Sequence, residues 1–139
     1  MKEVGMLNAE ISYAISRLGH MDEIIICDAG FPIPLGVKTI DISLAPNKPT
    51  LVEVLSELLK YFSVERAILA DETRKLNPTR FNDIIGLFDK SVEVETISHA
   101  ELKQRSRSVK AVVRTGDFTA YSNVLLVSGA GSRWYVEER

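Results

Sequence analysis

The apolar run from Ile24 to Cys27 constrains the fold of this chain more than any other stretch. It is short, rich in β-branched residues and uninterrupted, which is typical of a strand buried on both faces of a sheet. Asp28 follows it directly, and the turn-forming segment 29–34 comes next. Because ligands bind at the carboxyl ends of strands in open α/β sheets, this run predicts a central strand that delivers an aspartate to a binding site.

Gly19 and His20 precede this strand, at the end of a predicted helix whose apolar residues recur at i, i+3, i+4 and i+7. His20 and Asp28 are eight positions apart and could flank one pocket, with the carboxylate fixing the orientation of the imidazole. The alternative is structural: Asp28 caps a turn and His20 is an ordinary residue at a helix end.

The rest of the chain alternates between helical and strand patterns. Further strands are predicted at residues 40–44, 67–70, 92–97, 111–113 and 124–127. Further helices are predicted to begin after the capping residues Thr50, Asn77 and Ser98. This order predicts one three-layer α/β/α domain over residues 1–139. Because the last two strands are too close together for a helical crossover, the sheet should be mixed, with at least one antiparallel pairing.

Composition excludes several classes of protein. The formal net charge of −2 gives no footprint for nucleic-acid binding. The single cysteine, Cys27, excludes an internal disulfide framework and is expected to be a small core residue rather than a nucleophile. No apolar stretch approaches the roughly 18 residues of a membrane span. We therefore expect a cytoplasmic protein with no membrane partner.

The motifs of many site types are absent from the sequence. It contains no P-loop, no complete dinucleotide-binding glycine pattern, no zinc-type histidine pair and no cysteine cluster, so no metal or cofactor is expected. The remaining candidates are polar residues in loops or at predicted element ends: His20, Asp28, His99, Lys103, Tyr121 and Asn123. Such groups suit a polyhydroxylated ligand and proton transfer. Taken singly, each is more often an ordinary polar surface residue.

Several short motifs, taken together and in order, resemble the ribose pyranase family, which is related to fucose mutarotase. They are Leu18-Gly19-His20, Asp28-Ala29-Gly30, Asn77-Pro78, Ser98-His99 with Lys103, Arg114-Thr115-Gly116 and Tyr121-Ser122-Asn123. The resemblance covers residues 1–129, nearly the whole chain. Gly30 favours the ribose branch, because relatives of the fucose branch typically carry a larger residue there.

The resemblance implies an isomerase that interconverts β-D-ribopyranose and β-D-ribofuranose without a cofactor, and so supplies the furanose that ribokinase uses. The catalytic histidine of the family matches His20. Its substrate-binding residues match Asp28, His99, Lys103, Tyr121, Ser122 and Asn123. The resemblance also implies a homodecamer with D-ribose sites shared between subunits, and we expect Tyr121 and Asn123 to complete the pocket of an adjacent subunit.

Two alternatives stay open at this point. The chain could be a mutarotase for another sugar such as L-fucose, although Gly30 argues against that reading. It could also be a non-catalytic sugar-binding protein, although a His20–Asp28 pair suited to proton transfer would then have no purpose. Residues 130–139 depart from the short ending of the family and form an atypical tail.

Overall fold

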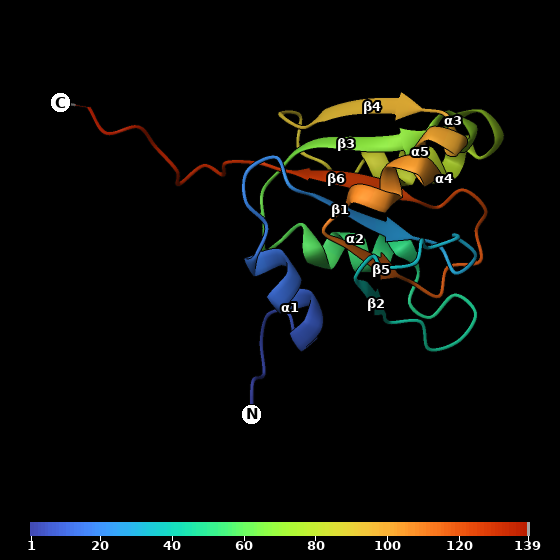
Figure 1. The fold of residues 1–139 in the computed structure, drawn as a ribbon, viewed down its shortest axis with the longest axis horizontal. Helices are drawn as coiled ribbons and strands as arrows, with labels where there is room; N and C mark the ends of the chain where they lie inside the picture. The colour runs from blue at the N-terminus through green and yellow to red at the C-terminus, as the bar shows by residue number, and fades with distance from the viewer. Residues whose placement is uncertain (139) are drawn as a thin grey trace.

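The fold is described by a computed structural model covering residues 1–138. Figure 1 shows a twisted sheet with helices packed on both of its faces. In chain order the elements are α1 (Ala9–Ser16), β1 (Glu23–Cys27), β2 (Thr39–Asp41), α2 (Leu51–Leu58), β3 (Val64–Ala70), α3 (Asp71–Leu76), α4 (Pro78–Ile85), β4 (Glu93–Ile97), α5 (His99–Arg105), a 3₁₀ turn (Ser106–Ser108), β5 (Ala111–Arg114) and β6 (Val124–Ser128).

The six strands form one sheet in the order β2-β5-β1-β6-β3-β4. β6 is antiparallel to both of its neighbours, β1 and β3, whereas the other pairs are parallel. The predicted mixed sheet is therefore confirmed. The last two strands of the chain run in opposite directions without pairing with each other, because β1 lies between them.

Two apolar cores, one on each face of the sheet, make this a three-layer structure. Ile24 and Ile26 of β1 point to one face, where α1, α2 and α4 pack. Ile25 and Cys27 point to the other face, which is covered by α5 through Leu102. The strand is thus buried on both faces, as its unbroken apolar run predicts. No helix within residues 1–138 is long and apolar enough to cross a membrane.

The predicted capping residues begin their helices. Thr50 forms a reciprocal capping box with Glu53 at the start of α2. The side chain of Asn77 accepts a hydrogen bond from the backbone of α4, and that of Ser98 does the same for α5. The short helix α3 was not predicted, because Ala70 stands at its cap position and provides no side-chain hydrogen bond.

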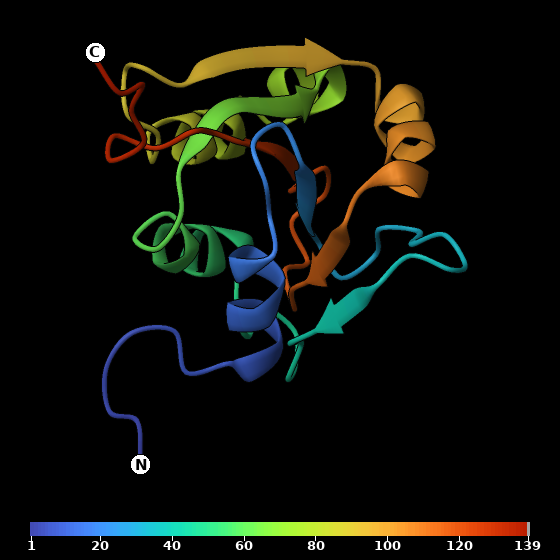
Figure 2. The ribbon, with the colours of Figure 1, turned by 60° about the vertical axis from the view of Figure 1, so that its left-hand side comes forward.

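The topology separates the polar loops onto two opposite edges of the sheet (Figures 1 and 2). The carboxyl ends of β1, β4 and β5 meet at one edge, and the antiparallel β6 starts at that same edge. The loop before β1, the start of β3 and the end of β6 meet at the other edge, because Met21 N donates to the Ser128 carbonyl at 2.9 Å. We call these the carboxyl edge and the amino edge.

Candidate active site

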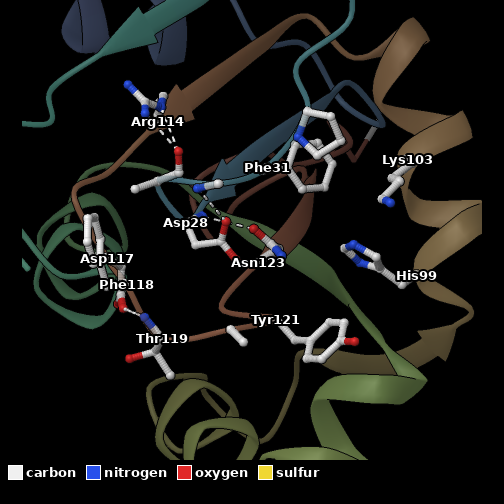
Figure 3. A pocket seen from close by; sticks show the side chains of 14 residues that line it. Asp28, Phe31, His99, Lys103, Arg114, Asp117, Phe118, Thr119, Tyr121 and Asn123 are labelled. Atoms are coloured by element: carbon white, nitrogen blue, oxygen red, sulfur yellow. Dashed lines mark hydrogen bonds between the residues drawn. The ribbon is translucent and has the colours of Figure 1, made fainter. Parts of the chain in front are cut away.

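A pocket of about 560 Å³ opens at the carboxyl edge of the sheet. Figure 3 shows Asp28 and Asn123 at its centre, His99 and Lys103 of α5 on one side, and Phe118 and Thr119 on the opposite side. The remaining labelled side chains of the lining are Phe31, Arg114, Asp117 and Tyr121. Five of the predicted site residues are brought together here: Asp28, His99, Lys103, Tyr121 and Asn123.

Asp28 and Asn123 are joined at the centre of the pocket. The backbone N–H of Asp28 donates to Asn123 Oδ1 at 2.8 Å, and the N–H of Gly30 donates to Asp28 Oδ1 at 3.0 Å. Burial raises the pKa of the Asp28 carboxyl, and the hydrogen bond from the Gly30 N–H opposes that shift only in part. A buried carboxyl with a raised pKa in a cleft is a typical acid–base candidate.

His99 occupies the first turn of α5, where its backbone N–H donates to Glu72 Oε2 at 2.7 Å. Its ring lies edge-on to both Phe31 and Tyr121, with centroids 6.1 Å and 5.2 Å away. Burial, and then the charge of Lys103 one turn later, lower the pKa of this imidazole. Both effects favour the neutral form of the imidazole, and burial contributes more than the charge of Lys103.

Two polar atoms of the pocket lack a hydrogen-bond partner within residues 1–138. They are His99 Nδ1 and Asn123 Nδ2, and both are buried. A buried polar group without a partner costs stability, and most such groups in folded proteins are satisfied. Because both residues line the same cavity, these atoms mark positions where a polar ligand would be bound. No group of three or more His, Cys, Asp or Glu side chains in the described part of the chain is arranged to hold a metal ion.

Arg114, which the sequence singled out only within a family motif, organises the turn after β1. Its Nη2 and Nε atoms donate to the Ala29 carbonyl at 2.7 and 3.1 Å, and its Nη1 reaches Asp41 Oδ2 at 2.8 Å. Arg114 is the last residue of β5 and pairs with Cys27 of the parallel strand β1, so its guanidinium lies beside the loop that follows β1. Arg114 thereby fixes the backbone between Asp28 and Phe31.

Asp117 is the second residue that the sequence analysis missed. It is 1% exposed and accepts hydrogen bonds from Leu51 N and Thr119 N, both at 2.8 Å. Burial alone would raise the pKa of this carboxyl, but these hydrogen bonds and the nearby Arg80 outweigh it, so the pKa lies below its usual range. Asp117 therefore ties the pocket segment 117–123 to the start of α2.

Ser122 stands apart from the other predicted substrate-binding residues. It is fully buried, its hydroxyl donates to Asp117 Oδ2 at 3.4 Å, and its side chain is not part of the pocket lining. The preceding Tyr121 has a φ of +61°, in the left-handed region that non-glycine residues seldom adopt. At this sharp turn the Tyr121 ring lies against His99, while the Ser122 hydroxyl is directed to Asp117.

His20 lies on the amino edge, not in the pocket. Its Nε2 is 2.9 Å from Glu65 Oε2 at the start of β3. The expected contact between His20 and Asp28 is therefore wrong within one chain, because the five-residue strand β1 separates them by about 16 Å. The carboxylate that orients His20 is that of Glu65. The two residues are 45 positions apart, so no local sequence pattern predicts that they meet.

The expectation that Tyr121 and Asn123 complete the pocket of an adjacent subunit is also wrong. Both residues line the same pocket as Asp28 of their own chain, and Asn123 is hydrogen-bonded to Asp28 directly. The reason is the direction of β6: as an antiparallel strand beside β1, it starts where β1 ends. Of the predicted residues, two lie outside the pocket lining: Ser122 is buried behind it, and His20 is on the opposite edge of the sheet.

Together, fold and pocket define a three-layer α/β protein with a small-molecule site lined by carboxyl, imidazole, amide and ammonium groups. The chain belongs to the RbsD / FucU transport protein family, whose sequence model matches residues 1–131. The family resemblance inferred from the sequence is thus confirmed, and residues 132–139 lie beyond the matched region.

Named relatives resemble this chain over most of their length. It is 45% identical over 132 residues to the D-ribose pyranase of Thermotoga maritima, with 93% of this chain and 98% of the relative covered. The structure of Bacillus subtilis RbsD complexed with D-ribose superposes with a TM-score of 0.88 at 40% identity, covering 93% of this chain and 98% of that one. The fucose mutarotase of Streptococcus pneumoniae in complex with L-fucose shares the fold, with a TM-score of 0.71 at 21% identity and coverage of 88% and 93%.

Proposed function

We propose that this chain interconverts β-D-ribopyranose and β-D-ribofuranose, the activity of a D-ribose pyranase, and is an isomerase. The observation that carries the proposal is the pair of buried atoms without partners, His99 Nδ1 and Asn123 Nδ2, in a cavity that Asp28 also lines. A sugar offers hydroxyl groups that both donate and accept, so it can satisfy these atoms together. The 40–45% identity to proteins named for ribose supports ribose as that sugar.

The chemistry needs only proton transfers. Opening of the ring removes a proton from the anomeric hydroxyl and delivers one to the ring oxygen; closure through another hydroxyl reverses these roles. The open-chain aldehyde between the two steps must be retained while it rotates. His99, Lys103, Tyr121 and Asn123 provide hydrogen-bonding groups for this, and the raised pKa of Asp28 suits a group that exchanges protons.

His20 is the proposed catalytic acid–base, and its place on the amino edge supports a site shared between subunits. Within one chain it cannot reach a sugar in the pocket, because β1 lies between them. Glu65 engages Nε2, which leaves Nδ1 to exchange protons with a substrate bound in a neighbouring subunit. We infer a ring of identical subunits, a cytoplasmic homodecamer, in which the amino edge of one chain faces the pocket of the next.

Saturation-transfer NMR on the purified protein tests the activity directly, because it reports exchange between the ring forms of a sugar. We expect accelerated pyranose–furanose exchange for D-ribose and little effect on L-fucose, and His20→Ala should slow ribose exchange by about 10²-fold or more. Faster exchange for L-fucose would reassign the substrate. No exchange with either sugar would leave a binding protein instead.

A further inference from the structure

The end of the chain runs past Ser63 and Glu65, and Glu65 is the residue that pairs with His20. After β6 it continues as residues 129–138, which we call the tail, leaving the body of the molecule at the amino edge (Figure 1). Gly129 N donates to the Ser63 carbonyl at 2.9 Å. A Cβ on Gly129 would lie 3.2 Å from Glu65 N, which is tighter than most such contacts, so a glycine favours this close approach of the two backbones.

A second glycine turns the tail toward His20. Gly131 has a φ of +80°, and a Cβ there would lie 3.0 Å from Ser63 Oγ. Trp134 then lies edge-on to His20, with ring centroids 5.8 Å apart and an interplanar angle of 63°. The imidazole therefore has two partners: the Glu65 carboxylate on Nε2 and the indole of Trp134 against the ring.

We propose that Trp134 is a positioning residue for His20, so that the tail is part of the catalytic apparatus; this inference rests on the proposed function. The hydrogen bond to Glu65 fixes one ring nitrogen, but an imidazole held at one atom can still turn about that bond. An aromatic ring packed edge-on restricts this rotation and keeps Nδ1 in one orientation. Because residues 132–139 lie beyond the family match, the device belongs to this chain rather than to the shared fold.

Steady-state kinetics of ribose ring exchange test the role of Trp134. In Trp134→Leu we expect kcat to fall roughly 3- to 10-fold, the range set by one aromatic pair, with KM nearly unchanged. Trp134→Phe keeps an aromatic edge and should restore most of the rate. Tyr135→Leu is the matched control, because Tyr135 is the next aromatic residue of the exposed tail, whereas the ring that contacts His20 is that of Trp134, and we expect no effect.

A fluorescence measurement tests the contact without any sugar. Trp134 is the only tryptophan in the chain, so all tryptophan emission reports on this position. His20→Ala should change the emission intensity and make the indole easier to quench with acrylamide, because the ring loses its packing partner. His99→Ala, which alters the other histidine of the chain on the opposite edge of the sheet, should leave the emission unchanged.

The two measurements separate failure of this inference from failure of the proposed function. If His20→Ala leaves the tryptophan emission unchanged, the contact between Trp134 and His20 is overturned. If Trp134→Leu keeps full activity, the positioning role of Trp134 is overturned. A raised KM with an unchanged kcat would also overturn it, because Trp134 would then touch the sugar instead. A His20-dependent emission in a protein that exchanges no ribose forms would overturn the proposed function and the catalytic role with it, leaving only the packing contact.

Discussion

At the scale of single residues, the surroundings of His99 in the pocket shift the pKa of its imidazole in opposite directions. Burial lowers the pKa of His99, and the charge of Lys103 adds to that shift, whereas Glu72 and Asp28 oppose it. The folded protein therefore binds fewer protons at this site than the unfolded chain, whose imidazole has an ordinary pKa of about 6.5. The stabilising contribution is complete above that pH and is lost as the pH falls through the folded-state pKa.

His99→Gln should therefore weaken the acid sensitivity of folding. We expect the variant to lose less unfolding free energy than the wild type between about pH 7.5 and pH 5, because an amide does not take up a proton on unfolding. Urea denaturation at the two pH values measures the difference. His20→Gln, on the far edge of the sheet, is the control for removing a histidine, and equal losses in wild type and His99→Gln would contradict the expectation.

Sequence signals identified pocket residues well where the signal was local. Asp28 directly follows a recognisable buried strand, and His99 stands in the first turn after the capping residue Ser98, so both positions could be predicted. Glu65 could not, because its pairing with His20 spans 45 positions and depends on β3 lying near β1 across β6. Asp117 was missed for the same reason: its backbone partner Leu51 is 66 positions away.

At the scale of elements, the loop after β2 braces the pocket from outside. Asn47 N donates to the Gly116 carbonyl at 2.7 Å, and Gly116 N donates to the Pro49 carbonyl at 3.0 Å. Asn47 Oδ1 also accepts from the N–H of Phe118, which lines the pocket. The sequence predicted a strand over residues 40–44, but β2 ends at Asp41, whose carboxylate accepts from Ser43 N and starts this loop instead.

Gly116→Ala should separate the loop from the sheet. The added Cβ would lie 2.5 Å from the Lys48 carbonyl oxygen and 2.6 Å from that of Ala45, closer than backbone atoms tolerate. We expect a loss of about 1–3 kcal/mol in unfolding free energy, measured by urea denaturation. Gly30→Ala is the matched control, because its Cβ would meet only Asp28 Oδ1 at 3.8 Å, and it should cause no loss. Equal stability of the two variants would contradict this expectation, because the loop would then move aside to accommodate the added Cβ at no cost in unfolding free energy.

At the scale of the whole molecule, the two halves of the proposed chemistry lie on opposite edges of one sheet. Asp28, His99 and Asn123 share the carboxyl edge, and His20 with Glu65 occupies the amino edge. His20 precedes β1 and Asp28 follows it, so the length of that strand holds them on opposite edges. Asn123 reaches Asp28 because β6 runs antiparallel beside β1, and local patterns do not encode that distant pairing.

Subunit mixing tests whether neighbouring chains join the two halves. His20→Ala subunits retain an intact pocket, and Asn123→Ala subunits retain an intact His20. If the amino edge of one chain serves the pocket of the next, random one-to-one hybrids contain sites without either lesion, about one quarter of the total. Each variant alone should be inactive, and mixtures under conditions that exchange subunits should recover up to about a quarter of the wild-type exchange rate.

The control for this experiment combines two pocket lesions, Asn123→Ala and Asp28→Ala. Both residues lie in one pocket of one chain, so no hybrid site escapes damage and the mixture should stay inactive. Recovery in the His20→Ala and Asn123→Ala mixture but not in this control requires His20 to act across a subunit boundary. Mixtures that exchange subunits without recovering activity would rule out the shared site, as would a wild-type protein that sediments as a fully active monomer.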